Sequence, residues 1–222
     1  MLDRNKLLIY PITDRKCMKH DFYLCIESAL KGGAEIIQLR EKNISEDDLI
    51  AEALKVKEIC RKYNALLIIN DNYKAALKAG ADGVHVGIED APVAEIRKIA
   101  GDNFIIGATA KTVEQARKAQ ADGADYLGTG AVFPSPTKTD AIRITHEQFK
   151  EIAESVDIPV VAIGGISKDN ITSLKNIGAV GAALVSAVFS ADDVERETAE
   201  LKNLCRETFG LYIVPCGTLK FL

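Results

Sequence analysis

Eight short runs rich in isoleucine, valine and leucine alternate along the chain with segments of helical periodicity, and this alternation constrains the fold most. The apolar runs predict strands at 7–13, 35–40, 66–70, 83–87, 104–109, 126–132, 159–164 and 182–186. The segments after them predict helices at 21–31, 45–63, 72–79, 91–100, 112–121, 146–155, 170–177 and 192–208. Eight strand-helix units predict an α/β protein whose parallel strands close into a single (β/α)8 barrel, the TIM barrel.

A glycine-alanine pair recurs at four of the expected helix-to-strand turns and supports this count. The pairs are Gly33-Ala34, Gly80-Ala81, Gly123-Ala124 and Gly178-Ala179. Each glycine can take the left-handed conformation that ends a helix and turns the chain back into the sheet. An open doubly wound sheet is the alternative, but it usually carries a glycine fingerprint after the first strand, and residues 10–13 read Tyr-Pro-Ile-Thr.

The domain organisation predicted from the sequence is one barrel over residues 1–209 and a C-terminal tail over 210–222. A chain of 222 residues that is 47% hydrophobic can bury the core of a full barrel. The tail is apolar but is broken by Pro215 and Gly217, and the sequence leaves its role open.

Composition and charge are those of an ordinary soluble enzyme. The formal net charge of −4 offers no long-range attraction to nucleic acid, so we expect no nucleic-acid partner.

Residues 7–12 are too few for a signal peptide or a membrane span, which predicts a cytoplasmic protein without a membrane partner. The five cysteines form no CxxC pair and no Cys/His cluster, so they are interpreted as packing thiols. A monomer and a homodimer both remain open.

The stretch 35–42 reads Glu-Ile-Ile-Gln-Leu-Arg-Glu-Lys and carries the first candidate site. On an extended chain Gln38, Arg40 and Lys42 project from one face. Arginine offers a planar fork and lysine a mobile point charge, and together they suit a diphosphate. A solvated edge strand would show the same alternation, and a closed barrel would exclude that alternative.

Two aspartates predict a metal site beside these cations. Asp71 follows the third expected strand and Asp90 follows the fourth, so their carboxylates meet at one end of the barrel. Two neighbouring carboxylates repel unless a cation lies between them, and Mg²⁺ accepts oxygen ligands while keeping waters for a phosphate. The alternative is that each aspartate caps the helix that follows it. We favour Mg²⁺ as the cofactor.

A second phosphate site and a lid are predicted further along the chain. Gly164-Gly165 and Ser186 follow strands seven and eight, where barrels commonly bind a phosphate. The long loop 134–141 leaves strand six over the barrel mouth, with Thr137 and Lys138 as candidates to reach diphosphate oxygens. His85 lies inside the fourth strand and is interpreted as a hydrogen-bonded core histidine.

These residues, taken in order, resemble the thiamine phosphate synthase family over about residues 8–187. The matching segments are Gln-Leu-Arg-Glu-Lys at 38–42, Ile-Asn-Asp at 69–71, Gly-Val-His-Val-Gly-Ile-Glu-Asp at 83–90, Thr-Lys at 137–138, Ala-Ile-Gly-Gly-Ile at 162–166 and Val-Ser-Ala at 185–187. The resemblance implies a TIM barrel that joins hydroxymethylpyrimidine diphosphate to thiazole phosphate and releases diphosphate. It also implies that the carbon-oxygen bond breaks first, giving a pyrimidinylmethyl cation that the thiazole nitrogen captures.

The resemblance assigns roles residue by residue. The pyrimidine diphosphate would be held by Gln38, Arg40, Lys42, Asn70 and Lys138. The thiazole phosphate would contact Ser135, Thr137, Gly165, Val185 and Ser186. Thr109 would take a serine role near the departing diphosphate, which makes Arg40, Lys42, Thr109 and Lys138 the predicted catalytic residues, and Mg²⁺ would bind Asp71 and Asp90.

This chain also departs from the family pattern. Ile88 stands where relatives often have glutamine, Thr109 replaces a common serine, and Ser135-Pro136 alters the expected lid. Two alternatives therefore remain: a related thiazole tautomerase, which needs no metal-diphosphate site, and a phosphate-sensing barrel without turnover.

Overall fold

The structure is a computed structural model that describes residues 2–134 and 143–210. Within these residues, eight parallel strands form one sheet in the order β1-β8-β7-β6-β5-β4-β3-β2. The strands are β1 (Ile9–Pro11), β2 (Ile36–Leu39), β3 (Leu66–Asn70), β4 (Gly83–Val86), β5 (Ile105–Thr109), β6 (Tyr126–Gly130), β7 (Val160–Ile163) and β8 (Gly181–Leu184). Every expected strand is present, so the predicted TIM barrel is confirmed.

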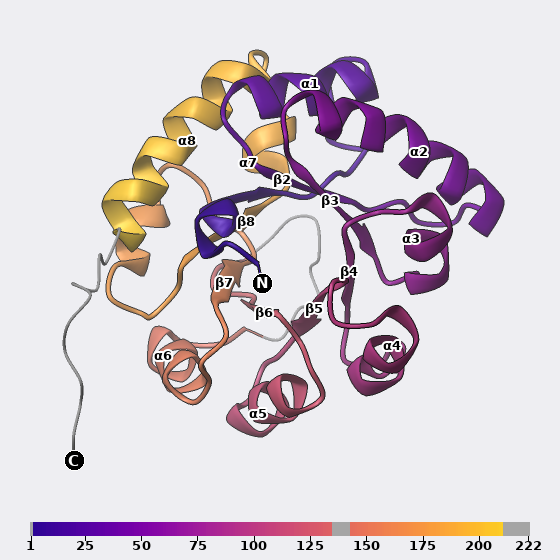
Figure 1. The fold of residues 1–222 in the computed structure, drawn as a ribbon. Helices are drawn as coiled ribbons and strands as arrows, with labels where there is room; N and C mark the ends of the chain where they lie inside the picture. Colours follow the sequence, from indigo (N-terminus) through magenta and orange to yellow (C-terminus); the bar gives the residue numbers. More distant parts are fainter. Residues whose placement is uncertain (1, 135–142, 211–222) are drawn as a thin grey trace.

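The barrel closes between β1 and β2. Ile12 forms a parallel bridge with Gln38, and the backbone N–H of Thr13 donates a hydrogen bond to the Gln38 carbonyl at 2.9 Å. Because β2 also pairs with β3, it has a neighbour on both sides. The edge-strand alternative for residues 35–42 is therefore wrong. Figure 1 shows the strands at the centre of a ring of helices.

The helices of the outer ring begin and end close to the expected positions. They are α1 (Phe22–Lys31), α2 (Glu46–Lys62), α3 (Tyr73–Ala79), α4 (Val93–Ala100), α5 (Val113–Ala121), α6 (His146–Glu154) and α8 (Val194–Phe209). Side chains at the first positions explain several starts, because Ser45 accepts from the Asp48 N–H and Thr112 accepts from the Gln115 N–H. None of these described helices is long and apolar enough to cross a membrane.

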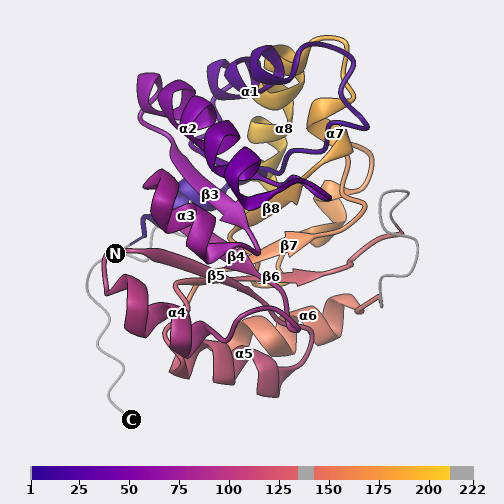
Figure 2. The ribbon, with the colours of Figure 1, turned by 90° about the vertical axis from the view of Figure 1, so that its right-hand side faces the viewer.

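Two helical segments differ from the prediction. The expected helix 170–177 is wrong, since only the short 3-10 helix η2 (Ile171–Leu174) forms there. The backbone of Lys175 is extended and Asn176 has a φ of 66°, which stops the helix after one turn. A second short helix, α7 (Ser186–Phe189), follows β8 directly and was not expected. In Figure 2 the strand arrows run in one direction, and α7 lies beyond the end of β8.

The core has an outer layer between strands and helices and an inner layer within the barrel. The inner layer is made of Leu7, Tyr10, Ile12, Ile36, Ile68, Tyr126, Val161 and Ala183. Leu7 comes from the 3-10 helix η1 (Arg4–Leu7), which contacts β1 and β8 at the amino ends of the strands. The amino end is therefore closed by apolar packing, and polar chemistry is left to the carboxyl end.

The glycine turns and the cysteines agree with the sequence-based interpretation. Gly33, Gly80, Gly123 and Gly178 all have positive φ, between 61° and 100°. Cys25, Cys60 and Cys205 are buried and Cys17 is half-buried, as packing thiols should be. Cys216 and the rest of the expected tail from residue 211 lie outside the described residues.

Candidate active site at the carboxyl ends of the strands

A chain of hydrogen bonds crosses the interior of the barrel below the carboxyl ends of the strands. Gln38 Nε2 donates to Tyr10 Oη at 2.9 Å, and Tyr10 Oη lies 2.8 Å from Tyr126 Oη. The two nitrogens of His85 continue the chain, with Nδ1 3.2 Å from Tyr126 Oη and Nε2 3.2 Å from Thr109 Oγ1. These residues come from β2, β1, β6, β4 and β5, so the chain ties five strands together.

Glycines on two strands make room for this chain. A Cβ on Gly107 would lie 2.1 Å from Tyr126 Cζ, and one on Gly128 would lie 3.0 Å from His85 Cε1. A side chain at Gly107 would therefore displace the Tyr126 ring from its place beside His85. Glycine inside a strand often marks such a close approach.

The hydrogen-bonded residues Gln38, Tyr10, Tyr126, His85 and Thr109 are called the floor below. Burial determines the protonation of its titratable members. It lowers the pKa of His85 to about 4, with the nearby Asp71 carboxylate opposing the shift, so the imidazole is neutral at pH 7. Burial also raises the pKa of Tyr10 and Tyr126, which keeps both phenols protonated. Both ring nitrogens of His85 have partners, which agrees with the interpretation of His85 as a hydrogen-bonded histidine. The floor is thus polar and uncharged.

The cationic residues lie above this floor, where β2 leads into α2. Lys42 Nζ is 2.7 Å from Asp71 Oδ2, and this pair joins the loop after β2 to the end of β3. Gln38 differs from the other two predicted members of the row, because it is 2% exposed and is already bonded to Tyr10. The structure therefore places Arg40 and Lys42 at the mouth, and Gln38 in the floor.

Asp71 and Asp90 lie together at the ends of β3 and β4. Burial raises the pKa of the Asp90 carboxyl, and the nearby Asp71 carboxylate raises it further. Asp71 also has a φ of 62°, in the left-handed region that aspartate adopts more often than most other non-glycine residues. The two aspartates thus follow neighbouring parallel strands of the barrel.

The helix-cap alternative for these aspartates is wrong. The cap of α3 is Asn72, whose side chain accepts from the Ala75 N–H at 2.9 Å. Asp90 Oδ2 accepts from the Gly87 N–H at 2.7 Å, within its own loop, while Pro92 precedes α4. Neither carboxylate is therefore engaged in starting a helix.

The donor set at this position fits magnesium. The described residues contain no group of three or more His, Cys, Asp or Glu side chains that could hold a metal ion. Mg²⁺ commonly uses one or two carboxylates and completes its shell with water and phosphate oxygens. Asp71 and Asp90 supply two carboxylates, and a cation between them would relieve their mutual repulsion.

Other predicted residues also lie at strand ends. Asn70 ends β3 and Thr109 ends β5. Gly165, with a φ of 62°, follows β7, and its carbonyl accepts from Asn170 Nδ2 at 2.9 Å. Val185 lies between β8 and α7, and Ser186 is the first residue of α7. The remaining predicted residues, Ser135, Thr137 and Lys138, lie outside the described residues.

Sequence reasoning missed the two tyrosines of the floor and the residues Thr13 and Arg15 after β1. Tyr10 and Tyr126 look like ordinary apolar strand residues in the sequence. The signal that could have found Tyr126 is Gly107 on the neighbouring strand, because glycine inside a strand often marks the close approach of a large side chain.

Comparisons with known proteins place this chain in a family. The sequence model described as thiamine monophosphate synthase matches residues 9–188. The protein from Fusobacterium nucleatum named thiamine-phosphate synthase is 50% identical over 91% of this chain and 99% of its own length. The one of that name from Clostridioides difficile is 45% identical over 89% of this chain and 96% of its own length.

Solved structures agree with the sequence matches. The thiamine phosphate pyrophosphorylase from Pyrococcus furiosus superposes with a TM-score of 0.85 at 42% identity, covering 93% of this chain and 99% of that one. A 3-hexulose-6-phosphate synthase superposes with a TM-score of 0.63 at 18% identity, covering 89% of this chain and 99% of that one, and shows the shared barrel alone. The chain belongs to the thiamine monophosphate synthase family of transferases.

Proposed function

We propose that this chain is a Mg²⁺-dependent thiamine phosphate synthase. It transfers the hydroxymethylpyrimidine group from its diphosphate to thiazole phosphate and releases diphosphate. The observation that carries the proposal is the Asp71-Asp90 pair beside Lys42 and Arg40, because a leaving diphosphate needs both cationic side chains and a divalent ion. Membership of the family supports the choice of substrates.

The residues of this chain bind and orient the diphosphate end of the substrate. Arg40 offers two parallel N–H donors to phosphate oxygens, and Lys42 offers a point charge that can move from Asp71 to the anion. Asp71 and Asp90 would hold Mg²⁺, which when bound neutralises the remaining diphosphate charge. Lys138 is proposed to join them from the loop after β6.

The hydrogen-bonded floor supplies a polar, uncharged surface for the pyrimidine end. Thr109 is anchored by neutral His85, so its hydroxyl is held at the end of β5 near the departing diphosphate. The carbon-oxygen bond to diphosphate breaks, and the thiazole nitrogen supplies the electron pair of the new carbon-nitrogen bond. A neutral floor avoids repelling the positive charge that develops on the methylene carbon.

The thiazole phosphate is proposed to bind at the ends of β7 and β8. Gly165, Val185 and Ser186 lie there, and Ser135 and Thr137 are proposed to contact the same substrate. This position is the one that barrels commonly use for a monophosphate, which supports two separate phosphate sites. The cytoplasmic location and a homodimer remain predictions.

The direct test is to incubate the purified protein with both substrates and Mg²⁺ and to measure released diphosphate. We expect release that needs both substrates and stops with a chelator. Asp71→Asn should lose Mg²⁺ binding, measured by calorimetry, together with turnover. Asp125→Asn is the matched control, because Asp125 pairs with Arg97 at the amino end of the barrel. Absence of release at high enzyme concentration would favour the tautomerase or phosphate-sensing alternative.

A further inference from the structure

Thr13 holds the backbone of Arg40 on both sides. Its hydroxyl accepts a hydrogen bond from the Arg40 N–H at 2.9 Å and lies 3.3 Å from the Arg40 carbonyl, to which it donates. Thr13 is completely buried, so water cannot replace either bond. These contacts come after β2 has ended at Leu39, where the sheet ladder no longer constrains the chain.

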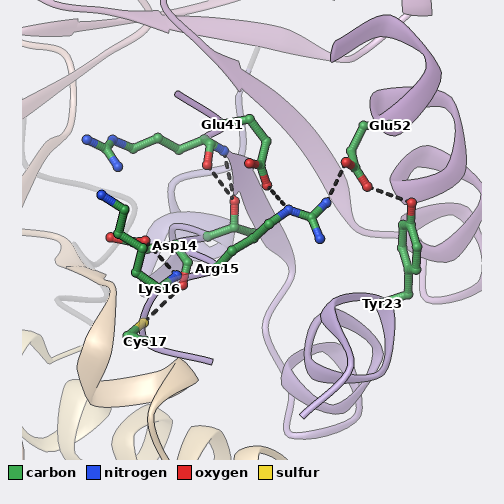
Figure 3. Close-up of polar contacts among 9 residues, drawn as sticks. Asp14, Arg15, Lys16, Cys17, Tyr23, Glu41 and Glu52 are labelled. Carbon is green, nitrogen blue, oxygen red and sulfur yellow. Dashed lines mark hydrogen bonds and ion pairs between the residues drawn. The ribbon is translucent and has the colours of Figure 1, made fainter. Parts of the chain in front are cut away.

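Arg15 holds the next residue of the same loop. Its Nε donates to Glu41 Oε1 at 2.7 Å, and its other arm pairs with Glu52 of α2. The guanidinium also stacks on the ring of Phe22, with its carbon 3.6 Å from the ring centroid. Figure 3 shows Arg15 between the two glutamates, with Tyr23 on the other side of Glu52.

Both carboxylates are thereby fixed. Tyr23 Oη donates to the second oxygen of Glu52 at 2.6 Å, which orients that carboxylate toward Arg15. The Glu41 side chain is only 9% exposed, against 43% for Arg15. Burial raises the pKa of the Glu41 carboxyl, and the positive charge of Arg15 opposes that rise. Arg15 therefore favours the ionised form of Glu41.

Glu41 stands between the two cations that are proposed to bind diphosphate. Without a partner, its negative charge would compete with the anion for Arg40 and Lys42. In the structure Glu41 pairs with Arg15, which follows β1 and also pairs with Glu52 of α2, so the carboxylate of Glu41 is directed to Arg15.

We propose that Thr13 and Arg15 are positioning residues for the diphosphate site and act through Arg40 and Glu41 without contacting the substrate. Thr13 sets the backbone from which the Arg40 fork projects, and Arg15 holds the Glu41 charge away from the anion. The inference rests on the proposed function, because it takes diphosphate to be the ligand of Arg40 and Lys42.

The test compares variants in two measurements: the Kd of inorganic diphosphate with Mg²⁺, by calorimetry, and the KM of each substrate. Thr13→Val removes the hydroxyl at constant size, and we expect it to raise the diphosphate Kd and the KM of the pyrimidine substrate at least about tenfold, because small misplacements of a binding group are expensive. Thr13→Ser keeps the hydroxyl and should restore both. The KM of thiazole phosphate should not change.

The second arm of the test concerns charge. Arg15→Met should weaken diphosphate binding by freeing Glu41, and the double variant Arg15→Met with Glu41→Gln should recover most of that affinity. Arg97→Met is the control, since Arg97 pairs with Asp125 at 2.6 Å at the opposite end of the barrel and should affect only thermal stability. Thermal melts of all variants show which of them are folded.

The outcomes separate the two proposals. Wild-type diphosphate affinity in folded Thr13→Val and Arg15→Met would overturn the positioning role, as would equal losses in Thr13→Ser and Thr13→Val. If wild-type protein binds diphosphate but releases none from the two substrates, the transferase proposal fails. The diphosphate Kd values of the variants then still test the positioning role. If wild-type protein does not bind diphosphate, the positioning role is also wrong.

Discussion

The hydroxyl groups of Tyr10 and Tyr126 lie 2.8 Å apart inside the barrel, with their rings edge to face. The two residues are far apart in sequence and stand on β1 and β6. Their contact is the middle link between Gln38 and His85, so it joins the β2 side of the candidate site to the β4 and β5 side.

Tyr126→Phe should destabilise the protein by roughly 1–3 kcal/mol, because it leaves the buried hydroxyl of Tyr10 and the half-buried ring of His85 each short of a partner. Urea unfolding monitored by circular dichroism measures the change. Tyr63→Phe is the control, since that hydroxyl bonds to Glu27 in a less buried position and its loss should matter less. Equal effects from the two substitutions would contradict the importance of the internal chain.

Gly107→Ala should be more damaging than Gly128→Ala. A Cβ at Gly107 would lie 2.1 Å from Tyr126 Cζ, whereas at Gly128 the nearest atom is His85 Cε1 at 3.0 Å. We expect a loss of about 2 kcal/mol or more for Gly107→Ala and about 1 kcal/mol or less for Gly128→Ala. Thermal melts of the two variants side by side decide the order, and the reverse order would show that the Tyr126 ring can move without penalty.

His85 should make the fold sensitive to acid. Its folded pKa of about 4 is below the usual value of 6.5, so folding favours the neutral form. The stability that this adds is present above pH 6.5 and is lost as the pH falls toward 4. Between pH 7 and pH 4.5 the wild type should lose roughly 2 kcal/mol more than His85→Gln in urea unfolding. His20→Gln, on an exposed residue, is the control and is measured at the same two pH values.

Asp90→Asn should separate stability from activity. Burial and the Asp71 carboxylate both oppose ionisation of Asp90, so removing its charge in metal-free buffer should leave the melting temperature unchanged or raise it. Turnover should nevertheless fall by orders of magnitude, because the proposed Mg²⁺ ligand is lost. Differential scanning calorimetry with a chelator, beside a diphosphate-release assay, tests both halves. A lower melting temperature would show that Asp90 has a structural role.

Arg40→Lys should impair the enzyme although it keeps the charge. The change replaces a two-pronged donor by a point charge, and we expect the KM of the pyrimidine substrate to rise and kcat to fall. The thiazole phosphate KM serves as the internal reference and should stay constant. Unchanged kinetics would mean that Arg40 does not bind the diphosphate through its planar fork.

Local patterns in the sequence were enough to determine the barrel. The eight apolar runs and the glycine turns at Gly33, Gly80, Gly123 and Gly178 act within a few residues, and each was found where it was expected. The prediction of a helix at 170–177 was wrong, because the apolar spacing on which it depended does not show that the backbone of Lys175 is extended and ends η2. Asp71 and Asp90 were expected to lie close together because parallel strands bring all their carboxyl ends to one side, and the metal that they are proposed to hold stays a prediction.

Only the tertiary structure decided which side chains meet across the barrel. Tyr10 and Tyr126 come together because β1 and β6, which are not neighbours in the sheet, both turn these side chains into the interior of the barrel, and the separation of the two residues along the chain does not show this. The same holds for Arg15, which pairs with Glu41 and Glu52 only after β1, β2 and α2 have packed. The sequence by itself predicted that Arg40 and Lys42 reach the mouth of the barrel, whereas packing placed Gln38 below it and decided which residues hold the others in place.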